Sequence, residues 1–233
     1  MYSVNNLNIK LCAASTIMNK IVENIQPTKR STYRHGDLYR VLLESAVRLA
    51  SNGGADAVIL REVTRQAGVA PNAAYRHFAD HNALLQAVSL AAQSALAIAI
   101  EKEIAAVSDI ENSVEKARAH LRAVGVGYLR FAQTEPGLFG MAFSVPNDLS
   151  NVTNPASAGE SGLTPFQLFG AALDMLVEAG ILPVDRRKFS EIFAWSAVHG
   201  FALLVLQGPL RSLDKAQTEF IGQHLIDMVE RGL

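Results

Sequence analysis

The sequence predicts an all-α protein. Apolar residues recur at helical spacing along most of the 233 residues, and no segment shows the apolar–polar alternation of a half-buried strand. Glycine and proline fall between the periodic segments, where they end one helix and start the next. The predicted architecture is an N-terminal three-helix helix-turn-helix domain, joined by a long helix to a C-terminal helical domain.

The three N-terminal helices are short, and local signals mark their ends. Asp37 is a plausible N-cap for the first helix, which ends at Gly53. Gly68 supplies the backbone freedom that a tight turn between the second and third helices requires. Pro71 suits the first turn of the third helix, where its missing N–H costs nothing. The expected bounds are 37–51, about 60–67, and 71 to about 78.

The body is expected to consist of longer helices. Asp80 caps a connecting helix of roughly 37 Å, given a rise of 1.5 Å per residue. Residues 144–163 are rich in Ser, Pro, Asn and Gly and are expected to form an extended linker. The expected helices are 82–106, 112–134, 138–143, 165–178, 186–207 and 215–231. The expected domains are a flexible basic leader (1–32), the helix-turn-helix (33–81) and a ligand-binding and dimerisation domain (82–233).

Composition excludes several classes of protein. The single cysteine, Cys12, rules out a disulfide scaffold and a multi-cysteine zinc module, and it suits a reducing compartment. The sequence has no run of about 18 uncharged apolar residues, so no membrane span is predicted. No secretory signal is evident, and a cytoplasmic location is therefore expected. His120, His199 and His224 are too scattered to predict a metal site. Neither a metal nor a cofactor is expected.

The net charge of −1 is unevenly distributed. Residues 1–90 contain ten Lys or Arg and six Asp or Glu, a net charge of +4, whereas residues 91–233 carry a net charge of −5. A basic front and an acidic body suggest two tasks. Chance produces splits of this size too, so the split alone does not assign a partner.

The N-terminal unit presents side chains that suit nucleic acid. Five apolar residues have the spacing of a small shared core: Val63, Ala67, Val69, Ala74 and Phe78. The faces left over carry donors of the kind that meet phosphates and base edges, namely Arg61, Thr64, Arg65, Asn72, Ala73, Arg76 and His77. For Arg65 we favour the interpretation as a solvated charge over that of a contact. A basic arm upstream suits backbone contacts and includes Lys29, Arg30, Arg34 and His35.

Several short motifs here resemble the DNA-binding domain of TetR-family transcriptional regulators. They are Tyr-Arg-His-Gly-Asp-Leu at 33–38, Leu-Arg-Glu-Val at 60–63, Ala-Gly-Val-Ala-Pro at 67–71, Tyr-Arg-His-Phe at 75–78 and Leu-Leu at 84–85. The resemblance implies that the third helix lies in the major groove, with Asn72, Ala73 and Arg76 nearest the bases. It implies phosphate contacts from Arg34, Arg61, Thr64, Tyr75, His77 and His81. Tyr75 has a second interpretation, as a core residue.

This sequence departs from the family pattern at three positions. Ile59 and Ala70 stand where the family usually has Ser or Thr, and His81 stands where it usually has Lys. Each change weakens a phosphate contact, and affinity for DNA depends on such contacts. We expect the basic arm to compensate in part.

The C-terminal part resembles a TetR-like domain named for its Trp-His-Gly motif, here Trp195, His199 and Gly200. The resemblance implies a ligand site whose candidate residues are Tyr128, Phe131, Phe139, Phe143, Phe169, Trp195 and His199. Trp195 and His199 share one helix face. The interpretation that we favour is that Trp195 is a packed core residue and that His199 satisfies a buried polar group. The lining predicts an apolar or amphipathic small-molecule effector.

Two apolar stripes near the C-terminus predict a partner beyond the domain's own core. They comprise Phe193, Ala197, Phe201, Leu204 and Val205 on one helix, and Phe220, Ile221, Leu225 and Met228 on the next. In TetR-like proteins the corresponding helices form a homodimer, which implies a double-stranded, roughly palindromic operator. The resulting hypothesis is a repressor that an effector releases from its operator. The alternatives are a DNA-binding regulator without a ligand and an all-helical enzyme, for which no recognisable catalytic motif is present.

Overall fold

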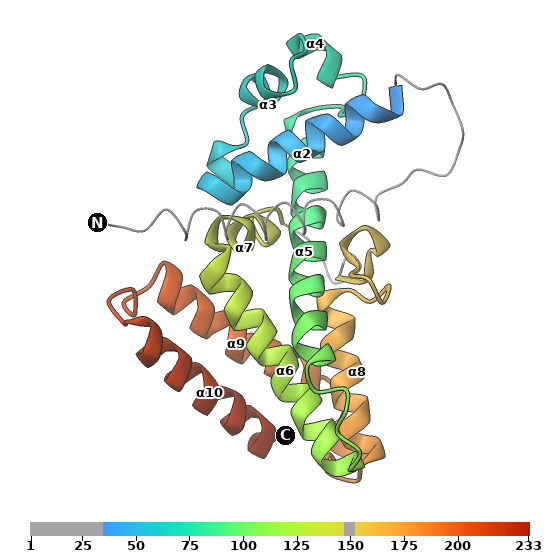
Figure 1. The fold of residues 1–233 in the computed structure, drawn as a ribbon, viewed down its shortest axis with the longest axis vertical. Helices are drawn as coiled ribbons and strands as arrows, with labels where there is room; N and C mark the ends of the chain where they lie inside the picture. The colour runs from blue at the N-terminus through green and yellow to red at the C-terminus, as the bar shows by residue number, and fades with distance from the viewer. Residues whose placement is uncertain (1–34, 147–151) are drawn as a thin grey trace.

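The computed structural model describes residues 35–146 and 152–233, and these two ranges contain helices and no strand. The predicted all-α class is therefore confirmed. Three helices form a head at the N-terminal end, and α5 leads from the head into the body (Figure 1). The head helices are α2 (His35–Gly53), α3 (Leu60–Gln66) and α4 (Pro71–Ala74). The basic leader 1–32, with Cys12, and the candidate contact Arg34 lie outside the described residues.

The head keeps the predicted order, with two corrected boundaries. The first helix begins at His35, so Asp37 lies inside its first turn and is not the N-cap. The third ends at Ala74, earlier than expected, because the chain turns there to reach the extended N-cap of α5. Gly68 has a φ of 70°, and the Val69 N–H donates to the Thr64 carbonyl at 3.0 Å, which closes α3 with a glycine-dependent turn.

The connecting helix α5 (His81–Ala105) contributes many buried side chains to the hydrophobic core. The Asp80 carboxylate accepts a hydrogen bond from the Ala83 N–H at 2.8 Å, as an N-cap does. By length and composition this helix is apolar enough to cross a membrane, but 67% of its most apolar stretch is buried inside the fold. Burial against the helices around it accounts for that composition.

The described part of the body has five further helices, of which the first three pack against α5 and the last two pack against α6. They are α6 (Ser113–Thr134), α7 (Pro136–Ala142), α8 (Pro165–Glu178), α9 (Ser190–Leu206) and α10 (Lys215–Gly232). A 3₁₀ turn at Val184–Arg186 replaces the expected start of α9, and Phe189, which has a φ of 64°, precedes its first residue. Capping boxes built on Thr164 and Asp214 start α8 and α10.

Two glycines let α6 lie close to two neighbours. A Cβ on Gly127 would be 2.7 Å from the Ile100 Cα on α5. A Cβ on Gly125 would be 2.9 Å from the Ile226 side chain on α10. Because such distances are below van der Waals contact, larger residues would push these helices apart.

The segment expected to be a linker is partly packed. Residues 152–163 include a 3₁₀ turn, Pro155–Ser157, that lies against α5. The Ser94 hydroxyl donates to the Ala158 carbonyl at 2.6 Å. The Glu101 carboxylate accepts hydrogen bonds from the Glu160 N–H at 2.8 Å and the Ser161 N–H at 3.0 Å. These tertiary hydrogen bonds, rather than local helical periodicity, order the segment, so the linker prediction is wrong for its described part.

The head is fixed to the body through α7. A Cβ on Gly137 would lie 2.4 Å from the carbonyl oxygens of Ala50 and Ser51, in the last turns of α2. The Ser51 hydroxyl also donates to the Glu135 carboxylate at 3.2 Å. At the other end of α7, the Gln93 side chain of α5 donates to the Ala142 carbonyl at 2.9 Å. Both ends of α7 are therefore held by other helices.

Candidate nucleic-acid interface and effector site

The head exposes most of the side chains predicted to contact nucleic acid. Asn72, Tyr75 and Arg76, on α4 and the turn after it, are exposed, and so is Arg61 on α3. Neither Arg61 nor Arg76 has a carboxylate partner among the residues described. The surface therefore presents two uncompensated positive charges beside an amide and a phenol, and all three kinds of group bind phosphates or base edges.

The two interpretations of Tyr75 are separated by its exposure. Its side chain is 55% exposed, which excludes the core interpretation. Phe78, three residues on, is 4% exposed and stacks on Tyr39 with ring centroids 5.0 Å apart. His77 lies between these extremes, half-buried, with its ring 6.3 Å from that of Tyr39. Ala73 is also half-buried.

Two candidates have structural partners that the sequence did not indicate. Thr64 is buried, and its hydroxyl donates to the Leu60 and Arg61 carbonyls at 3.0 Å. This placement does not fit the expected phosphate contact, because the hydroxyl is satisfied within its own helix. The His81 Nε2 lies 2.6 Å from the Val58 carbonyl, so it donates a hydrogen bond that ties the start of α3 to α5.

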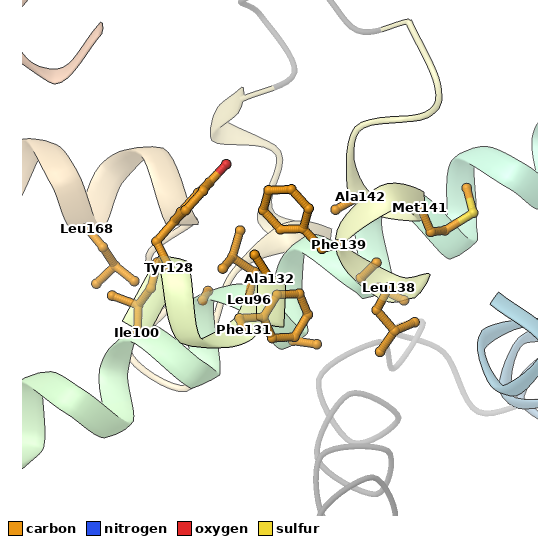
Figure 2. Close-up of a cluster of buried hydrophobic side chains, with 14 of the residues drawn as sticks. Leu96, Ile100, Tyr128, Phe131, Ala132, Leu138, Phe139, Met141, Ala142 and Leu168 are labelled. Atoms are coloured by element: carbon orange, nitrogen blue, oxygen red, sulfur yellow. The ribbon is translucent and has the colours of Figure 1, made fainter. Parts of the chain in front are cut away.

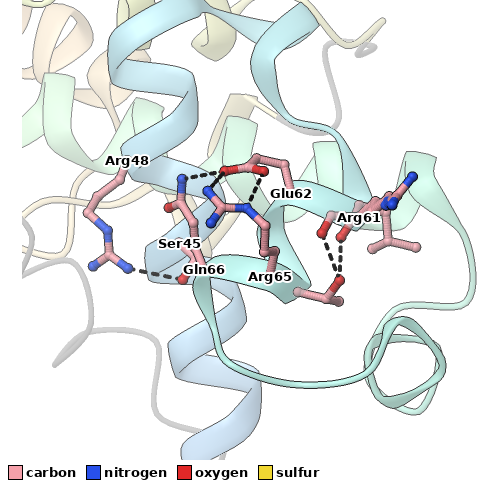
Figure 3. Close-up of polar contacts among 8 residues, drawn as sticks. Ser45, Arg48, Arg61, Glu62, Arg65 and Gln66 are labelled. Atoms are coloured by element: carbon pink, nitrogen blue, oxygen red, sulfur yellow. Dashed lines mark hydrogen bonds and ion pairs between the residues drawn. The ribbon is translucent and has the colours of Figure 1, made fainter.

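Arg65 is neutralised locally, in keeping with its interpretation as a solvated charge. Its guanidinium makes two hydrogen bonds to the Glu62 carboxylate, at 2.6 and 2.8 Å, and Gln66 donates a third (Figure 3). These bonds lower the pKa of the Glu62 carboxyl to about 2. Arg65 thus contributes little to the positive surface, and within residues 35–80 of the head Arg61 and Arg76 are its main exposed charges beside α4.

The body brings most of the predicted ligand residues into one aromatic cluster. We define the cluster by its ring contacts: Tyr128, Phe139, Phe143, Phe166, Phe169, Trp195 and His199, from α6, α7, α8, α9 and the residue after α7. Tyr128 meets Phe139 edge to face at 5.5 Å, and Figure 2 shows the two rings in the apolar core. Phe131 is buried too, but it makes no ring contact with these residues in the described chain.

The cluster has a graded depth. Tyr128, Phe139 and Phe169 are almost fully buried, whereas Phe143, Phe166, Trp195 and His199 are half-buried. One side of the cluster therefore belongs to the core of the body, and the other side reaches the surface. An apolar molecule could therefore reach the half-buried side of the cluster from the surface, without passing through the protein interior.

A short chain of hydrogen bonds crosses the cluster. The Trp195 indole N–H donates to the Tyr128 hydroxyl oxygen at 3.0 Å, and that hydroxyl lies 2.7 Å from His199 Nδ1. Burial raises the pKa of Tyr128 and lowers that of His199, so both are neutral near pH 7. The i, i+4 pair predicted from the sequence therefore shares one partner, Tyr128, which sequence spacing could not reveal.

The outer surface of α9 and α10 is apolar. Phe193, Phe220 and Met228 are each 65% exposed, and Leu204 and Ile221 are exposed as well. Of the other predicted stripe residues, Phe201 is buried, and Ala197, Val205 and Leu225 are half-buried. Figure 1 shows α9 and α10 side by side at the edge of the body, so the exposed residues lie on adjoining helices. We call this set the α9–α10 face.

Comparison with known proteins agrees with this architecture. Residues 42–88 match the family model for bacterial regulatory proteins of the tetR family, and residues 121–229 match the one for a tetracyclin repressor-like C-terminal domain. None of the curated proteins compared with the chain matches it.

Three solved structures illustrate the shared fold. A protein of unknown function from a Rhodococcus species is 26% identical, with a TM-score of 0.58 over 88% of this chain and 99% of that one. The TetR family regulator PfmR from Thermus thermophilus is 19% identical, with a TM-score of 0.51 over 82% and 98%. The regulator FadR from Bacillus subtilis, in complex with stearoyl-CoA, is 12% identical, with a TM-score of 0.50 over 84% and 99%.

The two family models match the head and the body in the order that the fold shows. The match to the head includes the turn at Gly68 and the exposed residues of α4, and the match to the body includes the aromatic cluster from Tyr128 to His199. The chain belongs to the TetR family of transcriptional regulators.

Proposed function

We propose that this regulator is a homodimeric, cytoplasmic repressor that binds a palindromic double-stranded operator and leaves it when a small apolar or amphipathic molecule enters the aromatic cluster. The observation that carries the proposal is the exposed group Arg61, Asn72, Tyr75 and Arg76, whose two arginines have no carboxylate partner among the described residues. The assignment of the body to the Trp-His-Gly type is part of the proposal.

Each exposed side chain has a role that its chemistry suggests. The guanidinium of Arg76 has two parallel N–H donors that suit guanine O6 and N7, and the amide of Asn72 has the donor and the acceptor that suit adenine in the major groove. Arg61 and the hydroxyl of Tyr75 suit phosphate oxygens, which set the position of the helix but not the sequence read. Ala73 offers a methyl group to a thymine methyl.

The α9–α10 face supports a homodimer. Exposed aromatic residues at this density are uncommon on a monomer, and a second copy is the partner that would cover the same face on both chains. A two-fold axis there would place two copies of α4 about one DNA turn apart, or roughly 34 Å.

The position of α7 supports a route from effector to DNA. Phe139 on α7 is part of the aromatic cluster, and Gly137 on the same helix touches the end of α2. A molecule that displaces Phe139 would therefore move α7 against the head. If the two heads move apart, the second half-site falls out of register and affinity drops.

A second candidate, a DNA-binding regulator without a ligand, is favoured by one observation. Tyr128, Phe139 and Phe169 already fill the deep side of the cluster, and the hydroxyl of Tyr128 has its hydrogen-bond partners. A thermal-shift screen with apolar compounds separates the two: stabilisation by a compound that also releases DNA supports the repressor, and a flat response favours the second candidate.

The dimer and the operator are tested by separate experiments. Selection from a random DNA pool should give a roughly palindromic site. Sedimentation should show a dimer that Phe193→Glu converts to monomer, because the charge would be buried in the interface. Phe193→Leu is the matched control and should stay dimeric. A monomer for the unmodified chain, or a selected site without symmetry, would contradict this part of the proposal.

A further inference from the structure

The proton positions in the aromatic cluster follow from its hydrogen bonds. The Trp195 indole nitrogen is a donor only, so the Tyr128 oxygen accepts from it. Tyr128 is fully buried, and among the described residues its hydroxyl hydrogen finds an acceptor only in His199 Nδ1, 2.7 Å away, so we assign Nδ1 as the acceptor. A neutral imidazole with Nδ1 as acceptor carries its proton on Nε2. His199 is therefore fixed in one tautomer.

The Nε2–H group of His199 has no hydrogen-bond partner among the described residues. The His199 ring is half-buried and lies among other rings, with centroids 4.7 Å from Phe143, 5.7 Å from Phe139 and 5.9 Å from Trp195. The cluster thus presents one oriented N–H donor in an aromatic setting that reaches the surface.

Among the described residues, no charged group contributes to the pKa shift of His199 or Tyr128. The lowered pKa of His199 has burial as its cause, with no neighbouring charge involved, and the pKa of Tyr128 responds to burial and to Trp195. A carboxylate ligand would have to lose its water here without a cation to replace it. A pure hydrocarbon would cover the N–H and leave it unpaired, which is also costly.

We propose that His199 Nε2–H recognises a neutral carbonyl oxygen, so that the effector is an uncharged apolar molecule that carries a ketone, ester or similar acceptor. This rests on the proposed function, in which an effector occupies the aromatic cluster. Tyr128 is a positioning residue: its hydroxyl holds the proton of His199 on Nε2.

Three probes of equal chain length test this: 2-nonanone, nonanoate and nonane. Trp195 is the only tryptophan of the chain, so its fluorescence reports binding at the cluster directly. For the full-length protein we expect 2-nonanone to bind roughly 3- to 10-fold more tightly than nonane, which is the range for one hydrogen bond. Nonanoate should bind more weakly than the ketone near neutral pH.

Two variants of His199 make the test specific. His199→Gln places an amide nitrogen near the position of Nε2 and should keep the preference for the ketone. His199→Asn reaches only as far as Nδ1 and should reduce that preference to about 1-fold. Both variants keep a polar amide side chain, so we expect them to fold equally well. Circular dichroism shows whether each variant is folded.

The outcomes separate this inference from the proposed function. If nonane and nonanone bind equally and both release operator DNA, the effector function stands and the carbonyl inference is wrong. Tighter binding of nonanoate, or an unchanged preference in His199→Asn, also overturns the inference. If no probe binds and none releases DNA, effector binding at this cluster fails together with the inference.

Discussion

Gly137→Ala tests whether the head is seated on the body as the structure shows. The added Cβ would lie 2.4 Å from the carbonyl oxygens of Ala50 and Ser51, about 1 Å inside ordinary contact. Backbone atoms cannot rotate aside, so α7 must move away from α2. Overpacking of this kind costs about 1–3 kcal/mol, and alanine's better helix propensity returns about 0.5 kcal/mol. The expected net loss is about 1–2 kcal/mol.

For a chain of this size that loss corresponds to a fall in Tm of roughly 2–8 °C. Thermal unfolding followed by circular dichroism, at one fixed protein concentration, measures it. Gly140→Ala is the matched control on the same helix, because a Cβ there meets nothing within 4 Å. The control should be neutral or stabilised by about 0.5–1 kcal/mol. If Gly137→Ala is as stable as Gly140→Ala, the close approach of α7 to α2 is refuted.

Three further predictions concern the DNA surface, a buried carboxylate and a buried histidine. Arg76→Ala should weaken operator binding by about 1–3 kcal/mol and relax specificity at one base pair, as measured on single-base operator variants; equal loss on every sequence would make it a phosphate contact. Glu230, only 2% exposed in its side chain, faces two arginines of α6, so Glu230→Gln should cost about 1–3 kcal/mol in urea unfolding. The exposed Glu219→Gln should cost under about 0.5 kcal/mol, and similar losses would contradict this. Burial lowers the pKa of His199 below 6.5 in the folded chain, so its contribution to stability is present above pH 6.5 and is lost as the pH falls. Unfolding between pH 7.5 and 5 should show a shallower loss in His199→Gln, with the residual slope including His120; an identical slope would exclude His199.

The helices were predictable where their signals are local. Asp80 and Asn112 cap α5 and α6 as their chemistry suggests, and Pro136 ends α6. Capping depends on neighbours three residues away, so sequence alone contains it. Residues 152–163 were not predictable, because the carboxylate that orders them, Glu101, lies about 60 residues earlier in the chain.

The candidate sites divide in the same way. The exposure of Asn72 and Arg76 was predictable from spacing, because the head needs only a small apolar face for its core. The hydrogen bonding of Thr64 could not be predicted from spacing, because helical periodicity does not show whether a hydroxyl donates to the backbone of its own helix. Trp195 and His199 were paired correctly by their i, i+4 spacing, but their shared partner, Tyr128, comes from another helix.

The head–body contact also bears on how an effector signal would reach DNA. A contact through flexible side chains would absorb a shift of about 1 Å, whereas α7 meets α2 through the backbone at Gly137, with no space for a single Cβ. We therefore expect a displacement of Phe139 to be passed on to α2. Gly137→Ala should accordingly weaken the effect of an effector on operator affinity. Equal coupling in Gly137→Ala and Gly140→Ala, measured as the ratio of operator Kd with and without effector, would show that the signal takes another route.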